Sequence, residues 1–184
     1  MGKRKIIVFI ATSADGFIAR KDGSVDWLDR PAPKGHYGMM AFWKSIDTIL
    51  FGRKTYDMSV KFVKEGKATP DMFAGVKHYV FSRKPRKKAL YGFEFAQEPI
   101  KKFVKRLRAQ DGKDIWMMGG GSIIGSFLDA GEIDEFIIHV IPTFIGEGIP
   151  LIAAKRRTVP LKLLSTKKFS DGVVKFHYQV IRSK

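Results

Sequence analysis

The sequence predicts one α/β domain with a mixed, mainly parallel sheet that is flanked by helices and ends in an antiparallel hairpin. Apolar strands alternate with helical segments along most of the chain, an order typical of sheets whose centre is parallel. The first strand, expected at 5–12, carries apolar residues on both faces, which indicates a central strand covered from both sides. The last strands, expected at 161–168 and 173–181, are joined by Ser170-Asp171-Gly172, a sequence typical of a hairpin turn.

The elements between these ends follow from their apolar patterns. We expect helices at 36–45, 99–109 and 122–130, and strands at 48–51, 78–81, 115–118 and 136–141. The inward face of the first helix is expected to carry Met39, Met40, Phe42 and Trp43. Ser122 is expected to cap the last helix, and Gly131 to end it. No repeat, low-complexity tract or linker divides the chain, so we expect a single domain over 1–184.

The composition excludes several classes of function. The chain has no cysteine, which excludes disulfides, zinc–thiolate sites and cysteine nucleophiles. The sequence has no histidine and carboxylate spacing typical of a metal site, so we expect no metal. The apolar run at 6–11 is shorter than a signal-peptide core and much shorter than a membrane span of about 20 residues. We therefore expect a cytoplasmic protein with no membrane partner.

The charge is strongly basic, with 34 Lys and Arg against 18 Asp and Glu, a net charge of +16. Basic clusters at 83–88, 101–108 and 155–157 are scattered over several expected elements. This scatter favours a solvated basic shell over a nucleic-acid surface, which stays an alternative. A third interpretation is that a few of these residues attract a small anionic ligand.

A glycine-rich strand end predicts a phosphate site. The strand at 115–118 leads into Gly119-Gly120-Gly121, and the helix after it begins with Ser122-Ile123-Ile124. Glycines let backbone N–H groups approach a phosphate closely, and a helix N-terminus adds about half a positive charge. The alternative is a tight turn whose glycines are needed only for positive φ angles.

Two further strand ends carry groups suited to phosphate. Gly52-Arg53-Lys54-Thr55 follows one strand, and Ser82-Arg83 follows the next. Taken alone, the first group is also compatible with a solvated basic helix start. Ligands of open α/β sheets collect at the carboxyl ends of the strands. The three ends together therefore predict a ligand with several phosphates.

The substrate side has fewer signals. Asp15, Asp26 and Trp27 lie between the first strand and the first helix, where a substrate loop is expected. Asp15-Gly16 is also typical of a plain turn, and Trp27 is equally compatible with a stacking platform and a loop anchor. No residue stands out as catalytic.

These motifs, in this order, resemble the dihydrofolate-reductase-like superfamily. The resemblance rests on Ser13-Ala14-Asp15-Gly16-Phe17-Ile18-Ala19, Asp26-Trp27, Gly52-Arg53-Lys54-Thr55-Tyr56 and Gly119-Gly120-Gly121. The stretches 127–135 and 141–151 resemble the reductase domain of riboflavin biosynthesis, the C-terminal domain of a bifunctional deaminase-reductase, more than true dihydrofolate reductase. The resemblance covers about 5–180.

The resemblance implies an eight-stranded mixed sheet with helices on both faces, NADPH as cofactor, a small-molecule substrate and a homodimer. By position, Ala11 and Ile18 would contact the nicotinamide end, and Trp27 matches a tryptophan in the loop over the active site. The phosphates would be held by Gly52, Arg53, Lys54, Thr55 and 119–126, with Ser82 and Arg83 near the 2′-phosphate.

At two positions that concern the substrate, the sequence departs from the pattern of the family. Met39 stands where dihydrofolate reductases carry an acidic residue, and Met118 stands where riboflavin reductases carry a glutamate. The resemblance therefore implies an NADPH-dependent reductase similar to 5-amino-6-(5-phosphoribosylamino)uracil reductase, with hydride transfer to a small substrate. The alternatives are dihydrofolate reduction, NADPH binding without turnover, and nucleic-acid binding.

Overall fold

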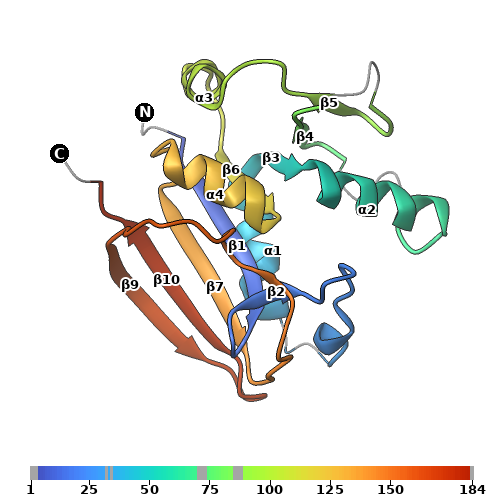
Figure 1. The fold of residues 1–184 in the computed structure, drawn as a ribbon, viewed down its shortest axis with the longest axis vertical. Helices are drawn as coiled ribbons and strands as arrows, with labels where there is room; N and C mark the ends of the chain where they lie inside the picture. The colour runs from blue at the N-terminus through green and yellow to red at the C-terminus, as the bar shows by residue number, and fades with distance from the viewer. Residues whose placement is uncertain (1–3, 32, 34, 70–73, 85–88, 183–184) are drawn as a thin grey trace.

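An eight-stranded sheet forms the centre of the molecule (Figure 1). The computed structural model describes residues 4–31, 33, 35–69, 74–84 and 89–182. The strand order is β5-β4-β3-β6-β1-β7-β10-β9. The strands are β1 (Ile6–Ser13), β3 (Ile46–Gly52), β4 (Lys77–Phe81), β5 (Phe93–Phe95), β6 (Asp114–Gly119), β7 (Glu135–Ile141), β9 (Leu161–Lys168) and β10 (Val174–Val180). The strands from β5 to β7 in this order pair in parallel, while β10 is antiparallel to both β7 and β9. The expected fold class and C-terminal hairpin are confirmed.

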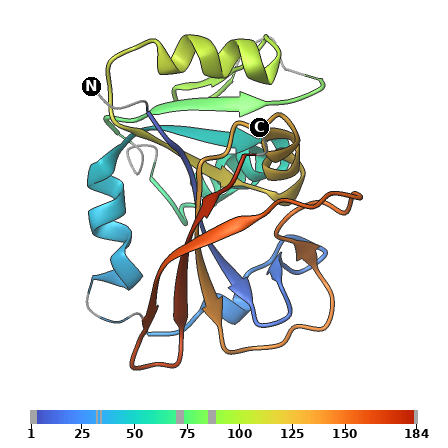
Figure 2. The same ribbon diagram turned by 90° about the vertical axis from the view of Figure 1, so that its left-hand side faces the viewer.

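Helices cover both faces of the sheet, as expected for a central β1 that is apolar on both sides. Ile6 and Val8 pack in one core cluster with side chains of α3 (Ile100–Arg108) and α4 (Gly121–Asp129). Ile7 and Phe9 pack in another with side chains of α1 (Met39–Ser45) and α2 (Arg53–Lys64). Figure 2 shows α1 and α4 on opposite sides of the sheet.

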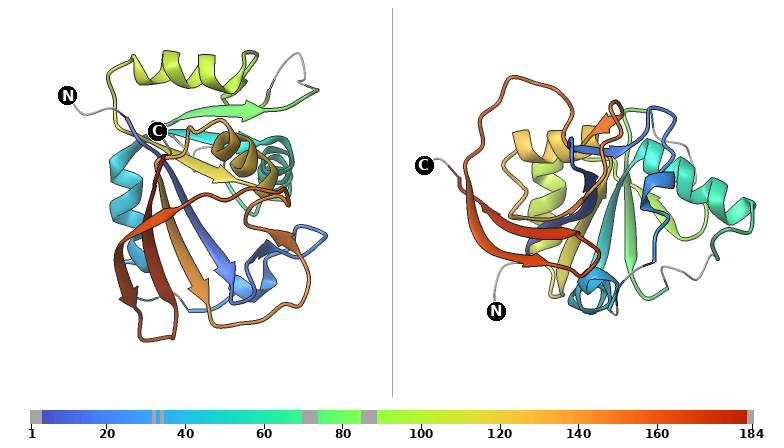
Figure 3. Two further views of the ribbon diagram at one scale, coloured as in Figure 1. Left: turned by 60° about the vertical axis from the view of Figure 1, so that its left-hand side comes forward. Right: turned by 90° about the horizontal axis from the view of Figure 1, so that it is seen from below.

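A second, two-stranded sheet was not expected. β2 (Phe17–Ala19) pairs antiparallel with β8 (Ile149–Pro150), beside the carboxyl end of β1 (Figure 3, left). These two strands are short and lie far apart in the sequence, so no local sequence pattern predicts that they pair. The short edge strand β5, which pairs in parallel with β4, was also not expected.

The first helix is shorter than expected. Residues 36–38 form a separate 3-10 turn, η2 (His36–Gly38), because His36 and Tyr37 have positive φ angles of 47° and 58°. These angles cannot continue a right-handed helix. Met40 is 57% exposed, so its expected inward position is wrong.

The start of α4 also differs from expectation. Gly120 is the N-cap, no side chain caps the helix, and Ser122 lies inside it. Ser122 is therefore not the cap. Gly131, with φ of 72°, follows the C-cap Ala130, which confirms its expected role in ending the helix. Within the described residues, no helix is both long and apolar enough to cross a membrane.

Candidate functional site

The glycine turn lies beside the end of β3. β3 pairs with β6 so that Phe51 is opposite Gly119, which places Gly52 next to the turn. A Cβ atom added to Gly52 would lie 3.1 Å from Ile123 Cγ2 and 3.4 Å from the carbonyl oxygen of Gly119. The two strand ends and the first turn of α4 are thus packed together, as the sequence predicted.

The three glycines of the turn have different physical reasons to be glycine. Gly119 has φ of 112°, which side chains rarely tolerate. A Cβ on Gly121 would collide with the carbonyl oxygen of Pro150 in β8. Gly120 has φ of −80°, and its Cβ would lie in ordinary contact, 3.6 Å from Ile18 Cδ1 and 3.7 Å from Thr55 Oγ1. Neither the φ angle nor the space around a Cβ atom therefore excludes a side chain at position 120.

Two helices begin at this edge without a side-chain cap. The N-cap of α2 is Gly52 and that of α4 is Gly120, and neither helix carries an acidic residue in its first turn. The first N–H groups of a helix have no acceptor within the helix, and a phosphate can supply one. Ile18 and Thr55 flank the position of Gly120, so the edge combines the two helix starts with a hydroxyl and an apolar wall.

The charged residues of this edge are partly engaged with one another. Arg53 donates from Nε to Asp57 Oδ2 at 2.8 Å and from Nη1 to the carbonyl oxygen of Lys84 at 3.1 Å. Ser82 Oγ accepts from the Lys84 N–H at 3.1 Å. Arg83 and Lys54 are exposed. The strand pairing of Gly52 with Phe81 puts the segment 82–84 beside the start of α2.

Not every predicted phosphate residue faces this edge. Ile124 is fully buried in the core cluster of α3 and α4, and Ile123 packs against that cluster. Their N–H groups bond to the carbonyl oxygen of Gly120, at 3.2 Å for Ile124 and 3.1 Å for Ile123. Gly121 is buried against Pro150, which leaves Gly120 and Ser122 as the part of the turn that a ligand could approach.

Trp27 lies in η1 (Asp26–Leu28) and carries an unsatisfied donor. Its side chain is 9% exposed and forms a cluster with Ile141 and Val173, against which Ala11 and Tyr37 pack. The indole Nε1 has no hydrogen-bond partner in the described part of the chain. A buried donor without a partner is costly, so this N–H points to an acceptor supplied by a ligand or a water.

The two candidate carboxylates already have protein partners. Asp15 Oδ2 accepts from the Gly146 N–H at 2.8 Å, and hydrogen bonds from Ser13 and then from Gly146 and Ile145 lower the pKa of its carboxyl. Asp26 forms a two-fold ion pair with Arg20, at 2.6 and 2.9 Å, and Arg20 lowers the pKa of Asp26. Both groups tie loops together. In the described residues, no set of three His, Asp or Glu side chains could hold a metal ion.

Sequence reasoning missed a polar cluster that lies beside the Trp27 cluster. The Tyr37 hydroxyl donates to Asp171, and Arg30 Nη2 donates to the Asp171 carbonyl oxygen at 2.7 Å. His139 Nε2 lies 3.1 Å from the Tyr37 carbonyl oxygen. Burial and then Asp171 raise the pKa of Tyr37, while burial lowers the pKa of His139. His139 on β7 is paired with Ala11 on β1. The alternation of side chains along β7 is the one sequence signal that could have placed His139 in this cluster.

The two methionines that the resemblance aligns with acidic residues of the family lie on one face. Met39 and Met118 are partly buried and pack against the cluster that contains Phe9 and Phe42. A thioether is only a weak acceptor. Neither methionine can therefore supply the charge of a carboxylate on this face.

Comparison with known proteins agrees with this architecture. The RibD C-terminal domain model matches residues 4–175. YwjB, an uncharacterized protein of Bacillus subtilis (strain 168), is 37% identical over 176 residues, which cover 96% of this chain and 98% of YwjB. The crystal structure of a putative riboflavin biosynthesis protein from Shewanella sp. PV-4 has a TM-score of 0.84 and 27% identity, over 97% of this chain and 99% of that one.

Dihydrofolate reductase from Enterococcus faecalis, complexed with NADP(H) and RAB-propyl, shares the fold. Its TM-score is 0.62 at 16% identity, with 96% of each chain covered. The dihydrofolate-reductase-like fold is thus established, and the match over 4–175 establishes the family. The chain belongs to the RibD C-terminal domain family.

Proposed function

We propose that the chain is an NADPH-dependent reductase that transfers hydride to a small heterocyclic substrate, similar to 5-amino-6-(5-phosphoribosylamino)uracil. The main support is Gly120, a glycine that neither its φ angle nor its packing requires. It lies between Ile18 and Thr55 at the N-terminus of α4. An approach of phosphate to the backbone explains this glycine and the two uncapped helix starts together.

The residues at this edge suit a dinucleotide. In the proposal, Gly120 and Ser122 of the glycine turn hold the pyrophosphate, and Thr55 supplies a hydroxyl to it. Ser82 and Arg83 hold the 2′-phosphate, since Arg53 is already engaged with Asp57. Ala11 and Ile18 form the wall against which the nicotinamide lies. NADPH, when bound, supplies the hydride.

The substrate side would position the acceptor and exclude water. Trp27 Nε1 would offer a hydrogen bond to a carbonyl or ring nitrogen of the substrate, and Ala11 packs against the same cluster. Asp15 and Asp26 are held in their charged forms by their partners, so neither is suited to deliver a proton. We infer that water or a substrate group supplies it. Catalysis would come mainly from orientation in a dry pocket.

Turnover with defined substrates tests the proposal. Oxidation of NADPH, followed by the absorbance of the reduced nicotinamide, would be measured with the phosphoribosylaminouracil intermediate and with dihydrofolate. We expect turnover of the uracil compound, and little with dihydrofolate because Met39 cannot pair with a pterin amine. Turnover of dihydrofolate alone would refute the substrate assignment. Tight NADPH binding without turnover of either compound would favour a binding protein over an enzyme.

Cofactor choice is tested by calorimetry with NADPH and NADH. Only NADPH carries the 2′-phosphate, and a charged hydrogen bond is worth roughly 1.5–3 kcal/mol, so we expect NADPH to bind about tenfold or more tightly. Arg83→Gln should remove most of this preference and leave NADH affinity unchanged. Equal affinity for both cofactors in the wild type would contradict the assigned 2′-phosphate site.

We also propose that two copies of the chain pair through the free edge of the sheet. Every residue of β9 is exposed, including Leu161, Leu163 and Leu164 at 42, 50 and 43%. An edge strand with apolar side chains and unpaired backbone groups is prone to pair with another chain. A second copy would bury these leucines.

Light scattering during gel filtration tests this pairing. We expect a mass of two chains for the wild type and of one chain for Leu163→Lys. Met40→Lys is the matched control, because Met40 is also an exposed apolar residue but lies on α1. A monomeric wild type, or a control that dissociates equally, would rule out the β9 interface.

A further inference from the structure

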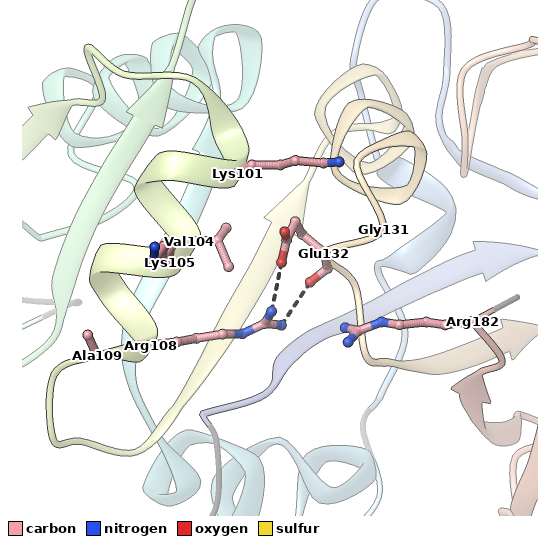
Figure 4. Close-up of a pocket in the computed structure, with 8 residues that line it drawn as sticks. All are labelled: Lys101, Val104, Lys105, Arg108, Ala109, Gly131, Glu132 and Arg182. Atoms are coloured by element: carbon pink, nitrogen blue, oxygen red, sulfur yellow. Dashed lines mark hydrogen bonds and ion pairs between the residues drawn. The ribbon is translucent and has the colours of Figure 1, made fainter. Parts of the chain in front are cut away.

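We propose that a basic pocket at the opposite end of the sheet from the glycine turn binds a small phosphate compound with several negative charges. The pocket has a volume of about 430 Å³ and is lined by Lys101, Lys105, Arg108, Arg182, Glu132 and Val104, among others (Figure 4). Its volume is within the range of small-molecule sites. The proposal concerns a second site and does not depend on the reductase activity.

The pocket lies at the amino ends of the central strands. Arg108 is the last residue of α3, and its Nε donates to the carbonyl oxygen of Arg4, just before β1, at 3.1 Å. Glu132 precedes β7, and Arg182 follows β10. The glycine turn is at the carboxyl end of β6, so the two sites are separated by the length of the sheet.

Two arginines paired with two carboxylates form one wall of the pocket. The Arg108 side chain is only 7% exposed. Its Nη1 donates to Glu132 Oε2 at 2.7 Å, and its Nη2 donates to the Glu132 carbonyl oxygen at 3.1 Å and to Asp134. Arg182 is paired with the other oxygen of Asp134 at 2.6 Å. The two arginines are thus oriented by the two carboxylates before any ligand binds.

Two lysines supply the charge that remains. Lys101 and Lys105 are four residues apart on α3, so both lie on the same side of the helix. Figure 4 shows the Lys101 side chain extending from α3 toward the segment that carries Gly131. In the part of the chain that the structure describes, neither lysine has a carboxylate partner. Like charges at this spacing repel each other, and a bound anion would relieve the repulsion.

The ligand class follows from these features. Two uncompensated ammonium groups match a group with at least two negative charges, and phosphate oxygens can accept from both. Ala109 is exposed and adds apolar surface beside the charges, with the buried Val104 behind it, which suits an organic group attached to the phosphate. A large polyanion would instead use charges spread over the surface and would not need the hollow.

Binding is tested with inorganic pyrophosphate as the probe, followed by backbone amide NMR in the presence of saturating NADPH. We expect chemical shift changes confined to 101–109, 131–132 and 182. The double variant Lys101→Gln, Lys105→Gln should weaken binding about tenfold or more, through loss of charged hydrogen bonds. The control Lys64→Gln, Lys77→Gln removes the same charge from exposed positions elsewhere and should bind as the wild type does. An equal loss in both double variants would overturn the proposal.

A variant that fills the pocket distinguishes binding in the pocket from binding to a charged surface. Ala109→Phe keeps every charge and occupies the hollow, so it should abolish pyrophosphate binding, with thermal unfolding measured to verify the fold. Unchanged pyrophosphate binding by this variant would refute the pocket. If the wild type also binds duplex DNA with shifts over all basic surfaces, the charges serve a nucleic acid instead. Loss of NADPH binding would leave these results unaffected, because the two sets of shifts lie at opposite ends of the sheet.

Discussion

The carboxyl edge of the sheet and the loops on the substrate side use different kinds of contacts. At the edge, Gly52 and Thr55 come from one short segment and Gly119 and Gly120 from another, and each segment is a strand end followed by a helix start. On the substrate side, Asp15 reaches Gly146, 131 residues away, and Tyr37 reaches Asp171, 134 residues away. The first region is assembled from local motifs, whereas the second depends on long-range pairs.

This difference separates two kinds of functional residue. At the edge, backbone groups and glycines do the binding in our proposal, so the sequence must supply only a turn and a helix start. On the substrate side, individual side chains such as Trp27 and His139 are positioned by the loops and strands around them. Substitutions in the first region should therefore act on the cofactor, and substitutions in the second on substrate or stability.

The largest effect is expected for Gly120→Ala. The added methyl fits against Ile18 and Thr55, but it would displace a phosphate from charged hydrogen bonds worth roughly 1.5–3 kcal/mol each, so NADPH should bind about a hundredfold more weakly. Calorimetry and thermal unfolding of the same sample measure binding and folding. Gly125→Ala is the matched control, since its Cβ would face Arg157 and Ile152. Wild-type affinity in Gly120→Ala would remove the turn from the cofactor site.

An intermediate effect is expected for Trp27→Phe. Phenylalanine keeps the apolar contacts with Ile141 and Val173 but lacks the indole N–H. Loss of one neutral hydrogen bond costs about 1 kcal/mol, so KM for the substrate should rise about fivefold while NADPH affinity stays the same. Steady-state kinetics measure KM for the substrate, and a separate titration measures the affinity for NADPH. A change in NADPH affinity with constant KM would place Trp27 on the cofactor side and break the comparison.

The smallest effect is expected for Asp15→Asn, and it concerns stability. The pKa of Asp15 is lowered from 3.8 in the folded protein. Its contribution to stability is therefore complete above that value and is lost as the pH falls through the lower folded pKa. Thermal unfolding should show a lower Tm for the variant at neutral pH and convergence with the wild type in strong acid. If instead the variant unfolds normally and loses turnover, Asp15 acts on the substrate and not as a loop anchor.

The sequence alone predicted much of the carboxyl edge of the sheet and little of the loops on the substrate side. It predicted the parallel centre, the hairpin, the glycine turn and the end of α4 at Gly131, because each follows from neighbouring residues. It predicted a cap at Ser122, but the turn geometry makes Gly120 the N-cap. Met40 was expected inward with its apolar neighbours, but only Met39, Phe42 and Trp43 pack against the core and Met40 is exposed.

What the sequence by itself determined is therefore the order of the elements and the identity of the groups at each strand end. Only the tertiary structure decided that Gly120 lies between Ile18 and Thr55, that Asp15 is bonded by Gly146, and that Trp27 keeps a buried donor free of protein partners in the described chain. The physical reason is range. Turns, caps and strand alternation are decided by residues a few positions apart, whereas burial and hydrogen-bond satisfaction also depend on segments far apart in the sequence, such as those that carry Asp15 and Gly146, 131 residues apart.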